Sequence, residues 1–560
     1  MNVSPTHRRT VLRGLALATA GTVLPTVAAA TAHAAPAPAP GTAAARSGAE
    51  PDTYALTLVH LDRAGAPTGA YTVRLAALEG PDAGVLRKPH DPSGTVTLRL
   101  PRGRYLFDSS IAAYDAAGAE IIGTDWMVRP RLDLDRDMTV VVDARTARQI
   151  DVRPPDPTAQ MQIGGVFVEV TYGGRRTTAN LVHTNPNTRM AHLGPAAEPG
   201  SVRSWVDAYW KGDRTTYVIA DVLTSDRTWT GIVRRPEPAE LGTLVVRAVA
   251  PPGGPGYGLV DCTPQVGATP GFGQAMRVPG ATTIMVSPER GDWDVTYTAP
   301  MEDPESEEPK EPNRYFVRGI TVPAGRTVVH TFDAPVFGPA LDPSPDARPP
   351  GVRTGDTLEL ALPLLADGDG HLPTAPPHRS ARTTLHRDGK LLASHDGDPG
   401  LATFTVPPGR AAYRLTATAA RPVGTVTACW SFLSATTRSP VELPLSVVRF
   451  TPPLAPDGTA APGRTHYVPV AVRGAAARSG SGTGTGPGMG MGPGVRSLTV
   501  RVSTDGGVRW SVAPVVGGRF AVAAPGPGGT VSLRAELVDS SGNTLTQTHI
   551  DAYGTSPATL

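Results

Sequence analysis

The residue types of a nucleophilic catalytic site are present in this sequence, but none lies in a recognisable motif. Serine, histidine and aspartate occur throughout the 560-residue chain. No serine lies in a Gly-x-Ser-x-Gly turn, and no His-Glu-x-x-His sequence offers a catalytic zinc site. Ser481 lies in a glycine-rich run, where the backbone cannot hold a nucleophile rigidly. We therefore expect a protein that is not an enzyme and has no catalytic residue.

The best candidate for metal binding is the segment Asp367-Gly368-Asp369-Gly370-His371. Alternating carboxylates on a glycine-rich turn can converge on calcium. The segment lacks the later bidentate glutamate of an EF-hand loop, and Asp-Gly pairs also occur in ordinary β-turns. The acidic run from Glu302 to Glu308 is typical of a solvated loop. We assign no metal ligand and no cofactor, and calcium binding near Asp367 and Asp369 stays open.

Three tryptophans, Trp205, Trp210 and Trp229, form the candidate ligand platform of the sequence. Aromatic faces in a row can stack against sugar rings, although packing in a core is the alternative for large apolar side chains. The remaining tryptophans each lie in a strand-like run, so we expect them in cores: Trp126, Trp293, Trp430 and Trp510.

Charge and cysteine content exclude several classes of partner. The 52 basic and 50 acidic residues are interspersed and give a net charge of +2, so no basic surface for nucleic acid or anionic lipid is expected. The two cysteines, Cys262 and Cys429, lie far apart in the chain and cannot form a structural zinc site by themselves. We favour two free thiols over a disulfide between them.

The N-terminus has the three parts of an export signal. Arg8 and Arg9 precede an apolar stretch from Gly14 to Ala30, and a small-residue cleavage site follows, ending at Ala34. The paired arginines resemble the twin-arginine export motif; a general secretory signal is the alternative. No later stretch approaches the roughly 20 apolar residues of a membrane span. We therefore expect a secreted, extracellular protein without a membrane span in its mature part.

The elements that would position these side chains are β-strands. The sequence contains 62 glycines and 59 prolines, which disfavour helices. Short runs with period-two alternation of apolar residues recur from Thr53 onward, which predicts several tandem β-sandwich domains. The expected divisions are an export signal at 1–34, a disordered linker at 35–50, a sandwich at 51–146, an elaborated region at 147–337 that holds one sandwich or two, a sandwich at 338–444, and an immunoglobulin- or fibronectin-like sandwich at 445–560 with a glycine-rich loop at 474–494.

A Pro-x-Gly-Arg element occurs three times between strand-like runs, beginning at Pro101, Pro323 and Pro407. Proline presets φ for the second position of a β-turn and glycine is favoured at the fourth, so we expect three tight reversals between antiparallel strands. The segment from Ser503 to Gly507 should form a hairpin turn, with its glycines at positive φ.

From Thr53 onward the chain resembles the region that follows the catalytic domain in large secreted subtilisin-type serine peptidases of actinobacteria. The resemblance lies in the segments 54–63, 367–371, 383–390, 446–452, 532–535 and 539–543, and the first domain is also similar to the carboxypeptidase regulatory-like sandwich. Such peptidases carry an Asp-x-Gly strand end, a His-Gly-Thr-His helix start and a Gly-Thr-Ser-Met nucleophile motif. Neither His-Gly-Thr-His nor Gly-Thr-Ser-Met occurs in this sequence, and we identify no Asp-x-Gly segment as the strand end of a peptidase. The resemblance thus implies fold and compartment, but no activity.

The function expected from these features is a non-enzymatic extracellular binding or scaffolding module. Sandwich cores hold shape and exposed loops carry recognition. Its partner would be a protein or a cell-wall polysaccharide, and not nucleic acid. The alternatives are a carbohydrate-binding protein and a protein associated with such peptidases, classed with them by homology alone.

Overall fold

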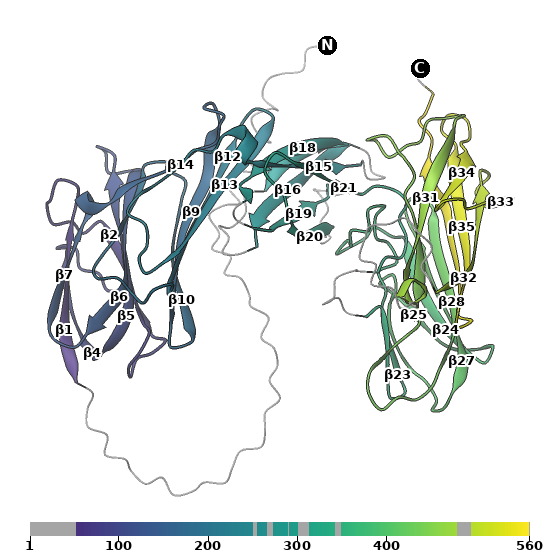
Figure 1. Ribbon diagram of the computed structural model, residues 1–560, viewed down its shortest axis with the longest axis horizontal. Helices are drawn as coiled ribbons and strands as arrows, with labels where there is room; N and C mark the ends of the chain where they lie inside the picture. The colour runs from purple at the N-terminus through teal and green to yellow at the C-terminus, as the bar shows by residue number, and fades with distance from the viewer. Residues whose placement is uncertain are drawn as a thin grey trace, which may run out of the picture. The chain divides into compact units, whose positions relative to one another are not determined.

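The computed structural model describes residues 52–249, 255–265, 273–288, 291–300, 313–341, 349–478 and 494–558. The export segment with Arg8, Arg9 and Ala34, the linker at 35–50, the acidic run at 302–308 and residues 479–493 of the glycine-rich loop lie outside these ranges. The described residues form 36 strands in seven sheets, which confirms the all-β, tandem β-sandwich prediction (Figure 1). Among the residues described, no helix is long and apolar enough to span a membrane.

Three consecutive sets of seven strands follow one pairing scheme. Unit 1 comprises β1 (Thr53–Leu61), β2 (Tyr71–Ala77), β3 (Leu86–Arg87), β4 (Thr95–Pro101), β5 (Gly103–Tyr114), β6 (Ile121–Leu134) and β7 (Met138–Asp143). Unit 2 comprises β8 (Arg148–Val152), β9 (Gln160–Tyr172), β10 (Arg175–His183), β11 (Thr188–His192), β12 (Val202–Lys211), β13 (Thr215–Ser225) and β14 (Ile232–Arg234). Unit 3 comprises β15 (Gly242–Ala248), β16 (Gly256–Pro264), β17 (Gln274–Val278), β18 (Gly280–Val286), β19 (Trp293–Thr298), β20 (Arg314–Ile320) and β21 (Thr327–Phe332).

In each of these units the first strand pairs antiparallel with the fourth and parallel with the seventh. The other four strands form the facing layer in the order third, second, fifth, sixth, all antiparallel. The region 147–337, in which the sequence leaves one sandwich or two open, thus contains two complete sets of strands.

The C-terminal part follows a related scheme in which the first strand of each unit is split into two antiparallel strands. In the first of its two units the seventh strand pairs antiparallel with the first, and in the second no seventh strand occurs among the described residues. Unit 4 comprises β22 (Gly351–Thr354), β23 (Thr357–Ala361), β24 (Ser380–Arg387), β25 (Lys390–Asp396), β26 (Leu401–Thr405), β27 (Ala411–Ala420), β28 (Thr425–Ser434) and β29 (Val441–Glu442). Unit 5 comprises β30 (Ser446–Phe450), β31 (Thr465–Gly474), the short helix α2 (Ala475–Arg478), β32 (Val495–Ser503), β33 (Ser511–Ala513), β34 (Arg519–Ala523), β35 (Thr530–Asp539) and β36 (Thr544–Gly554).

Neighbouring units share sheets through their outer strands. The sixth strand of unit 1, β6, pairs in parallel with the fourth strand of unit 2, β11. In the same way β13 of unit 2 pairs in parallel with β18 of unit 3. Units 4 and 5 join differently, because their sixth strands, β28 and β36, pair antiparallel and create an eight-stranded sheet. These ladders connect units 1, 2 and 3 to one another, and unit 4 to unit 5, by backbone hydrogen bonds; among the described residues no sheet joins unit 3 to unit 4.

A shared sheet is buried on both faces. On β6, Met127 and Leu132 belong to the hydrophobic core of unit 1, whereas Trp126 and Val128 belong to the core of unit 2. The sheet of β12 and β13 does the same: Ile219 faces the core of unit 2 and Val218 faces that of unit 3. A sheet covered on both sides replaces the alternating pattern by continuous apolar runs.

Most sequence-based expectations about local structure are confirmed. Trp126, Trp293 and Trp430 are at most 1% exposed, in three different cores. The turn after β32 has Gly506 and Gly507 at positive φ. The prediction for Trp510 is wrong: it precedes β33, is only partly buried, donates to the Gly507 carbonyl at 2.8 Å and lies under the Arg534 guanidinium.

The prediction that the Pro-x-Gly-Arg elements reverse the chain between paired strands is also wrong. They connect β4 to β5, β20 to β21 and β26 to β27, and in each case the two strands belong to different sheets. The turn therefore carries the chain across a sandwich from one layer to the other. Turn residues set the local backbone angles, but whether the next strand joins the same sheet depends on packing further along the chain.

Candidate functional site

The segment at Asp367, the candidate calcium site, closes on itself. The Asp367 N–H donates to the His371 carbonyl at 3.1 Å, and the Gly370 N–H donates to the Asp367 carbonyl at 3.0 Å. The Asp367 carboxylate accepts the His371 N–H at 2.8 Å with one oxygen, and the other lies 3.0 Å from His371 Nδ1. Both carboxylate oxygens are thus engaged within the turn.

The same five-residue turn occurs elsewhere in the chain. In the segments 62–66 and 539–543, the N–H of the first residue donates to the carbonyl of the fifth, and the N–H of the fourth residue, a glycine at positive φ, donates to the carbonyl of the first. The carboxylate of the first residue, an aspartate, accepts backbone N–H groups of the turn. Asp-x-x-Gly-x is therefore the turn signal of this protein. In the part of the chain that the structure describes, no group of three or more histidine, cysteine, aspartate or glutamate side chains is arranged to hold a metal ion.

Asp367 also belongs to a polar cluster where unit 3 contacts unit 4. The Asp369 carboxylate accepts the Thr331 N–H at 3.2 Å, and His371 Nε2 lies 3.4 Å from His330 Nδ1. Although burial opposes its charge, the hydrogen bond to Asp367 and the nearby carboxylates raise the pKa of His371. We call the residues His330, Asp333, Asp367, Asp369, His371, Arg421 and Arg449 the junction cluster.

Two arginines and one aspartate complete the junction cluster. Arg449 donates to the carbonyls of Gly338 and Asp367, and burial lowers its pKa to about 10. Burial raises the pKa of Asp333 to about 6, although the Tyr315 hydroxyl donates to its carboxylate. The Arg421 guanidinium lies 3.5 Å from the centre of the Phe337 ring. Arg449 and Asp333 thus use their polar groups in contacts within the chain, whereas Asp369 is exposed.

A buried histidine in unit 5 extends this network. The His549 ring is 2% exposed; its Nδ1 lies 2.9 Å from the Phe337 carbonyl and its Nε2 lies 2.8 Å from the Gln547 amide nitrogen. Gln547 also bonds both backbone groups of Val448, at 2.6 and 3.1 Å. A neutral ring that donates from Nδ1 and accepts at Nε2 satisfies every partner. Burial lowers the pKa of His549 to about 3.

The three tryptophans of the candidate platform do not form an exposed row. Trp205 is 4% exposed and stacks on Phe167, with ring centres 5.4 Å apart. Trp210 and Trp229 are partly buried and pack against the core of unit 2. Phe167 and Trp205 lie opposite each other on the paired strands β9 and β12, which explains the stacking.

The two cysteines are free. Cys262 is buried in the core of unit 3, where desolvation raises the pKa of its thiol. Cys429, on β28, lies 3.3 Å from the Thr416 hydroxyl, which donates to its sulfur. Their separate units exclude a disulfide between them without a rearrangement of the fold.

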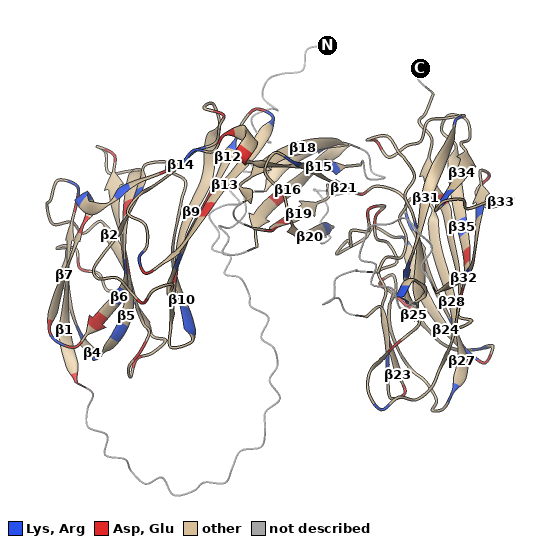
Figure 2. Cartoon of the chain, viewed as in Figure 1, with Lys and Arg blue, Asp and Glu red and all other residues tan. Residues whose placement is uncertain are grey.

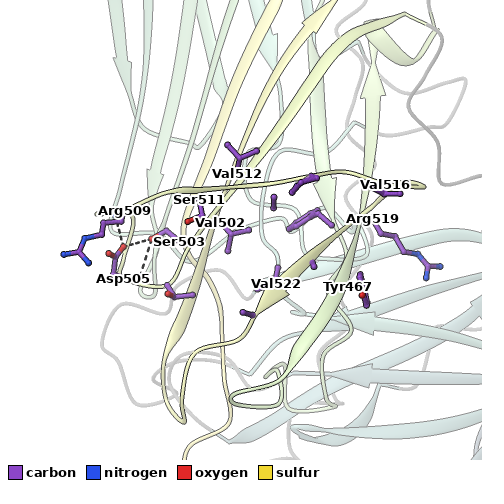
Figure 3. Close-up of a pocket in the computed structure, with 16 residues that line it drawn as sticks. Tyr467, Val502, Ser503, Asp505, Arg509, Ser511, Val512, Val516, Arg519 and Val522 are labelled. Carbon is purple, nitrogen blue, oxygen red and sulfur yellow. Dashed lines mark hydrogen bonds between the residues drawn. The ribbon is translucent and has the colours of Figure 1, made fainter.

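An open cavity lies at one side of unit 5 and was not among the sequence-based expectations. It has a volume of about 930 Å³ and lies between β33, the last strand of the eight-stranded sheet, and β34, the last strand of the facing sheet. We call it the unit 5 groove. Figure 3 shows valines from several strands along it, with Arg509 and Arg519 at opposite ends.

Exposed apolar side chains mark the rim of the unit 5 groove. Tyr467 is 64% exposed, Val512 56% and Val516 77%. Elsewhere the charges of both signs are interspersed over the strands (Figure 2). A sequence pattern could not identify the groove, because its lining residues are spread from position 467 to 523 and meet only through strand pairing.

Comparisons with known proteins do not identify a family. No protein-family model matches the chain, and no curated protein matches it. Among solved structures it is similar to BcpA, the major pilin subunit of Bacillus cereus, at 10% identity over 50% of this chain and 99% of that chain, with a TM-score of 0.12. It is also similar to the Bacillus anthracis TIE protein, at 10% identity over 73% of this chain and 72% of that chain, with a TM-score of 0.11. At these TM-scores the likeness carries no argument about function.

Proposed function

We propose that this protein is a secreted, non-enzymatic scaffold that binds another protein outside the cell, related to the accessory domains of subtilisin-type peptidases. The observation that carries the proposal is the strand pairing between units, which extends single sheets through β6 and β11, β13 and β18, and β28 and β36. Units joined by backbone ladders keep a fixed spacing of their loops and edges. A fixed spacing is what a scaffold needs and what a single catalytic site does not.

The use of polar groups supports binding over catalysis. The buried Asp367 and the partly buried His371 bond to each other, and the exposed Asp369 bonds to the Thr331 backbone. A catalytic acid or base needs an open side toward its substrate. A protein partner is favoured over a polysaccharide because Trp205 is buried against Phe167 and offers no open face for a sugar ring.

Crosslinking tests the proposal. Tagged full-length protein is expressed in its own host, and the culture supernatant is crosslinked and purified through the tag. We expect one protein to be recovered reproducibly, and no retention on peptidoglycan, chitin or cellulose. Recovery of no reproducible partner would refute the binding role, and retention on a polymer would favour the carbohydrate-binding alternative.

A second measurement tests the absence of activity. Purified mature protein should not be labelled by a fluorophosphonate probe, which reacts with activated serines. Labelling at a single serine, abolished when that serine is replaced by alanine, would overturn the non-enzymatic proposal.

A further inference from the structure

The fourth strand of a unit is where this protein accepts an added strand. In unit 2 it is β11, which receives β6 in parallel over five residue pairs; in unit 3 it is β18, which receives β13 over four. The fourth strand of unit 5 is β34, and within the described residues it has no strand on the side away from β31. The position that is filled in units 2 and 3 is therefore open in unit 5, as it also is in units 1 and 4, where β4 and β26 end their sheets. Unit 5 differs from those two units in the groove that lies beside its open strand.

The backbone of β34 can accept a strand. The Val470 N–H donates to the Gly518 carbonyl, and hydrogen-bonded pairs alternate along an antiparallel ladder, so Phe520 and Val522 bond to β31. The alternation directs the N–H and C=O groups of Ala521 and Ala523 to the open side. An unpaired row of such groups is a template for an added strand.

The unit 5 groove follows this open strand and supplies contacts for side chains. Its rim holds the exposed Tyr467, Val512 and Val516, which favour apolar residues in an occupant. Arg509 and Arg519 lie at its two ends (Figure 3), and their guanidinium groups form no hydrogen bond or ion pair with the residues that the structure describes. The one carboxylate in the lining, that of Asp505, accepts N–H and hydroxyl hydrogens of its own turn.

We propose that the unit 5 groove binds an extended segment of a partner protein, with an apolar centre and acidic residues at both ends, which pairs with β34 as an added strand. Main-chain hydrogen bonds to β34 would supply affinity, and the apolar rim and the two arginines would supply specificity. This inference rests on the proposed binding role and names its site.

The test uses the full mature protein and a fluorescent peptide whose five central residues alternate valine and threonine, matching the 5 residues of β34, with two glutamates at each end. Fluorescence anisotropy measures its affinity, and hydrogen exchange measures protection of the β34 amides. We expect binding with slower exchange at Ala521 and Ala523. Binding without that protection, or no binding, would overturn strand addition by a segment of this chemistry.

Two variants have matched controls. Arg519→Glu should lower the affinity for the peptide by at least about threefold, as expected for loss and reversal of an exposed charge pair. Its control, Arg496→Glu, changes an exposed arginine outside the groove and should leave the affinity unchanged. Val512→Glu should lower the affinity for the peptide by about tenfold or more. Val508 is 79% exposed and lies outside the lining, so Val508→Glu should leave the affinity unchanged. Equal effects of test and control variants would refute the assignment of the groove.

A third variant separates backbone pairing from side-chain contact. Ala521→Pro removes an N–H from the open side of β34, where proline is tolerated in an edge strand. It should abolish peptide protection at Ala523, while circular dichroism and melting temperature show that unit 5 stays folded. If that variant unfolds, hydrogen exchange of the unaltered protein decides the point, since peptide binding without protection of Ala521 and Ala523 would refute strand addition.

The supernatant crosslinking experiment distinguishes this inference from the general binding role. If the Val512→Glu variant fails to recover the partner that the unaltered protein recovers, the binding role and the groove assignment are both supported. If Val512→Glu still recovers it, the binding role stands and the groove assignment fails. A concentration-dependent dimer that Val512→Glu abolishes would show a second copy as the occupant and would refute the partner proposed here.

Discussion

Replacing His549 with asparagine should remove one contribution to the pH dependence of the stability of the segment around Phe337. In the folded protein burial lowers the pKa of His549 to about 3, against a usual value of 6.5. Between these values the unfolded chain binds the proton and the folded chain does not. The contribution to stability is therefore fully present above pH 6.5 and is lost as the pH falls toward 3.

The magnitude follows from the proton linkage. Lowering the pH from 7.5 to 5.0 should cost the folded state about 2 kcal/mol through His549 alone, at 1.36 kcal/mol per pH unit below the unfolded pKa. Asp333 and His371 have raised pKa values, so their contributions change in the opposite direction and are lost as the pH rises. Only the difference between the variant and the unaltered protein isolates His549.

Hydrogen exchange is the appropriate assay, because a protein of five units does not unfold in one step. The amides of Gly338 and Ala340 donate to the carbonyls of Ala366 and Pro363, at 3.0 and 3.1 Å, beside the His549 contact. Their opening free energy should fall between pH 7.5 and 5.0 by about 2 kcal/mol more in the unaltered protein than in His549→Asn.

The control is His395→Asn, on an exposed ring that is in water in both states. It should leave the pH dependence of the same amides unchanged. An equal pH dependence in His549→Asn and the unaltered protein would show that His549 is not held neutral by burial, and would refute the hydrogen-bond arrangement assigned to Gln547 and Phe337.

Three further predictions concern export, packing and turns. Changing Arg8 and Arg9 together to lysine should block secretion, measured by immunoblot of the supernatant; undiminished secretion would exclude the twin-arginine route. Trp205→Ala should destabilise its unit by about 3–5 kcal/mol, because it removes a buried indole from its stack on Phe167, and hydrogen exchange of the β12 amides measures this. A change below about 1 kcal/mol would contradict the burial. Gly542→Ala should cost about 1–2 kcal/mol, since Gly542 has φ of 84°, and unchanged hydrogen exchange of the β35 and β36 amides would contradict the turn geometry.

The positions of strands and of most buried residues could be read from the sequence alone. The alternating run 54–59 lies in β1, and Leu56 and Leu58 on one face are fully buried. Gly506 and Gly507 in the hairpin turn occupy the positive φ values expected of them. These features are local: period-two burial and backbone angles depend on neighbouring residues in the chain.

Which strands pair, and therefore where the candidate site lies, was decided by the tertiary structure. The parallel pairing of β6 with β11 joins residues about sixty positions apart, and the residues of either strand do not specify the other as its partner. The turn at Pro101 fixes a reversal but not the sheet that the next strand joins. The sequence left calcium binding at Asp367 open, whereas the structure shows both oxygens of its carboxylate in contact with His371. The unit 5 groove likewise exists only because β33 and β34 end two facing sheets on the same side. A strand's own residues specify which side is buried, whereas pairing and exposed edges depend on contacts between distant segments.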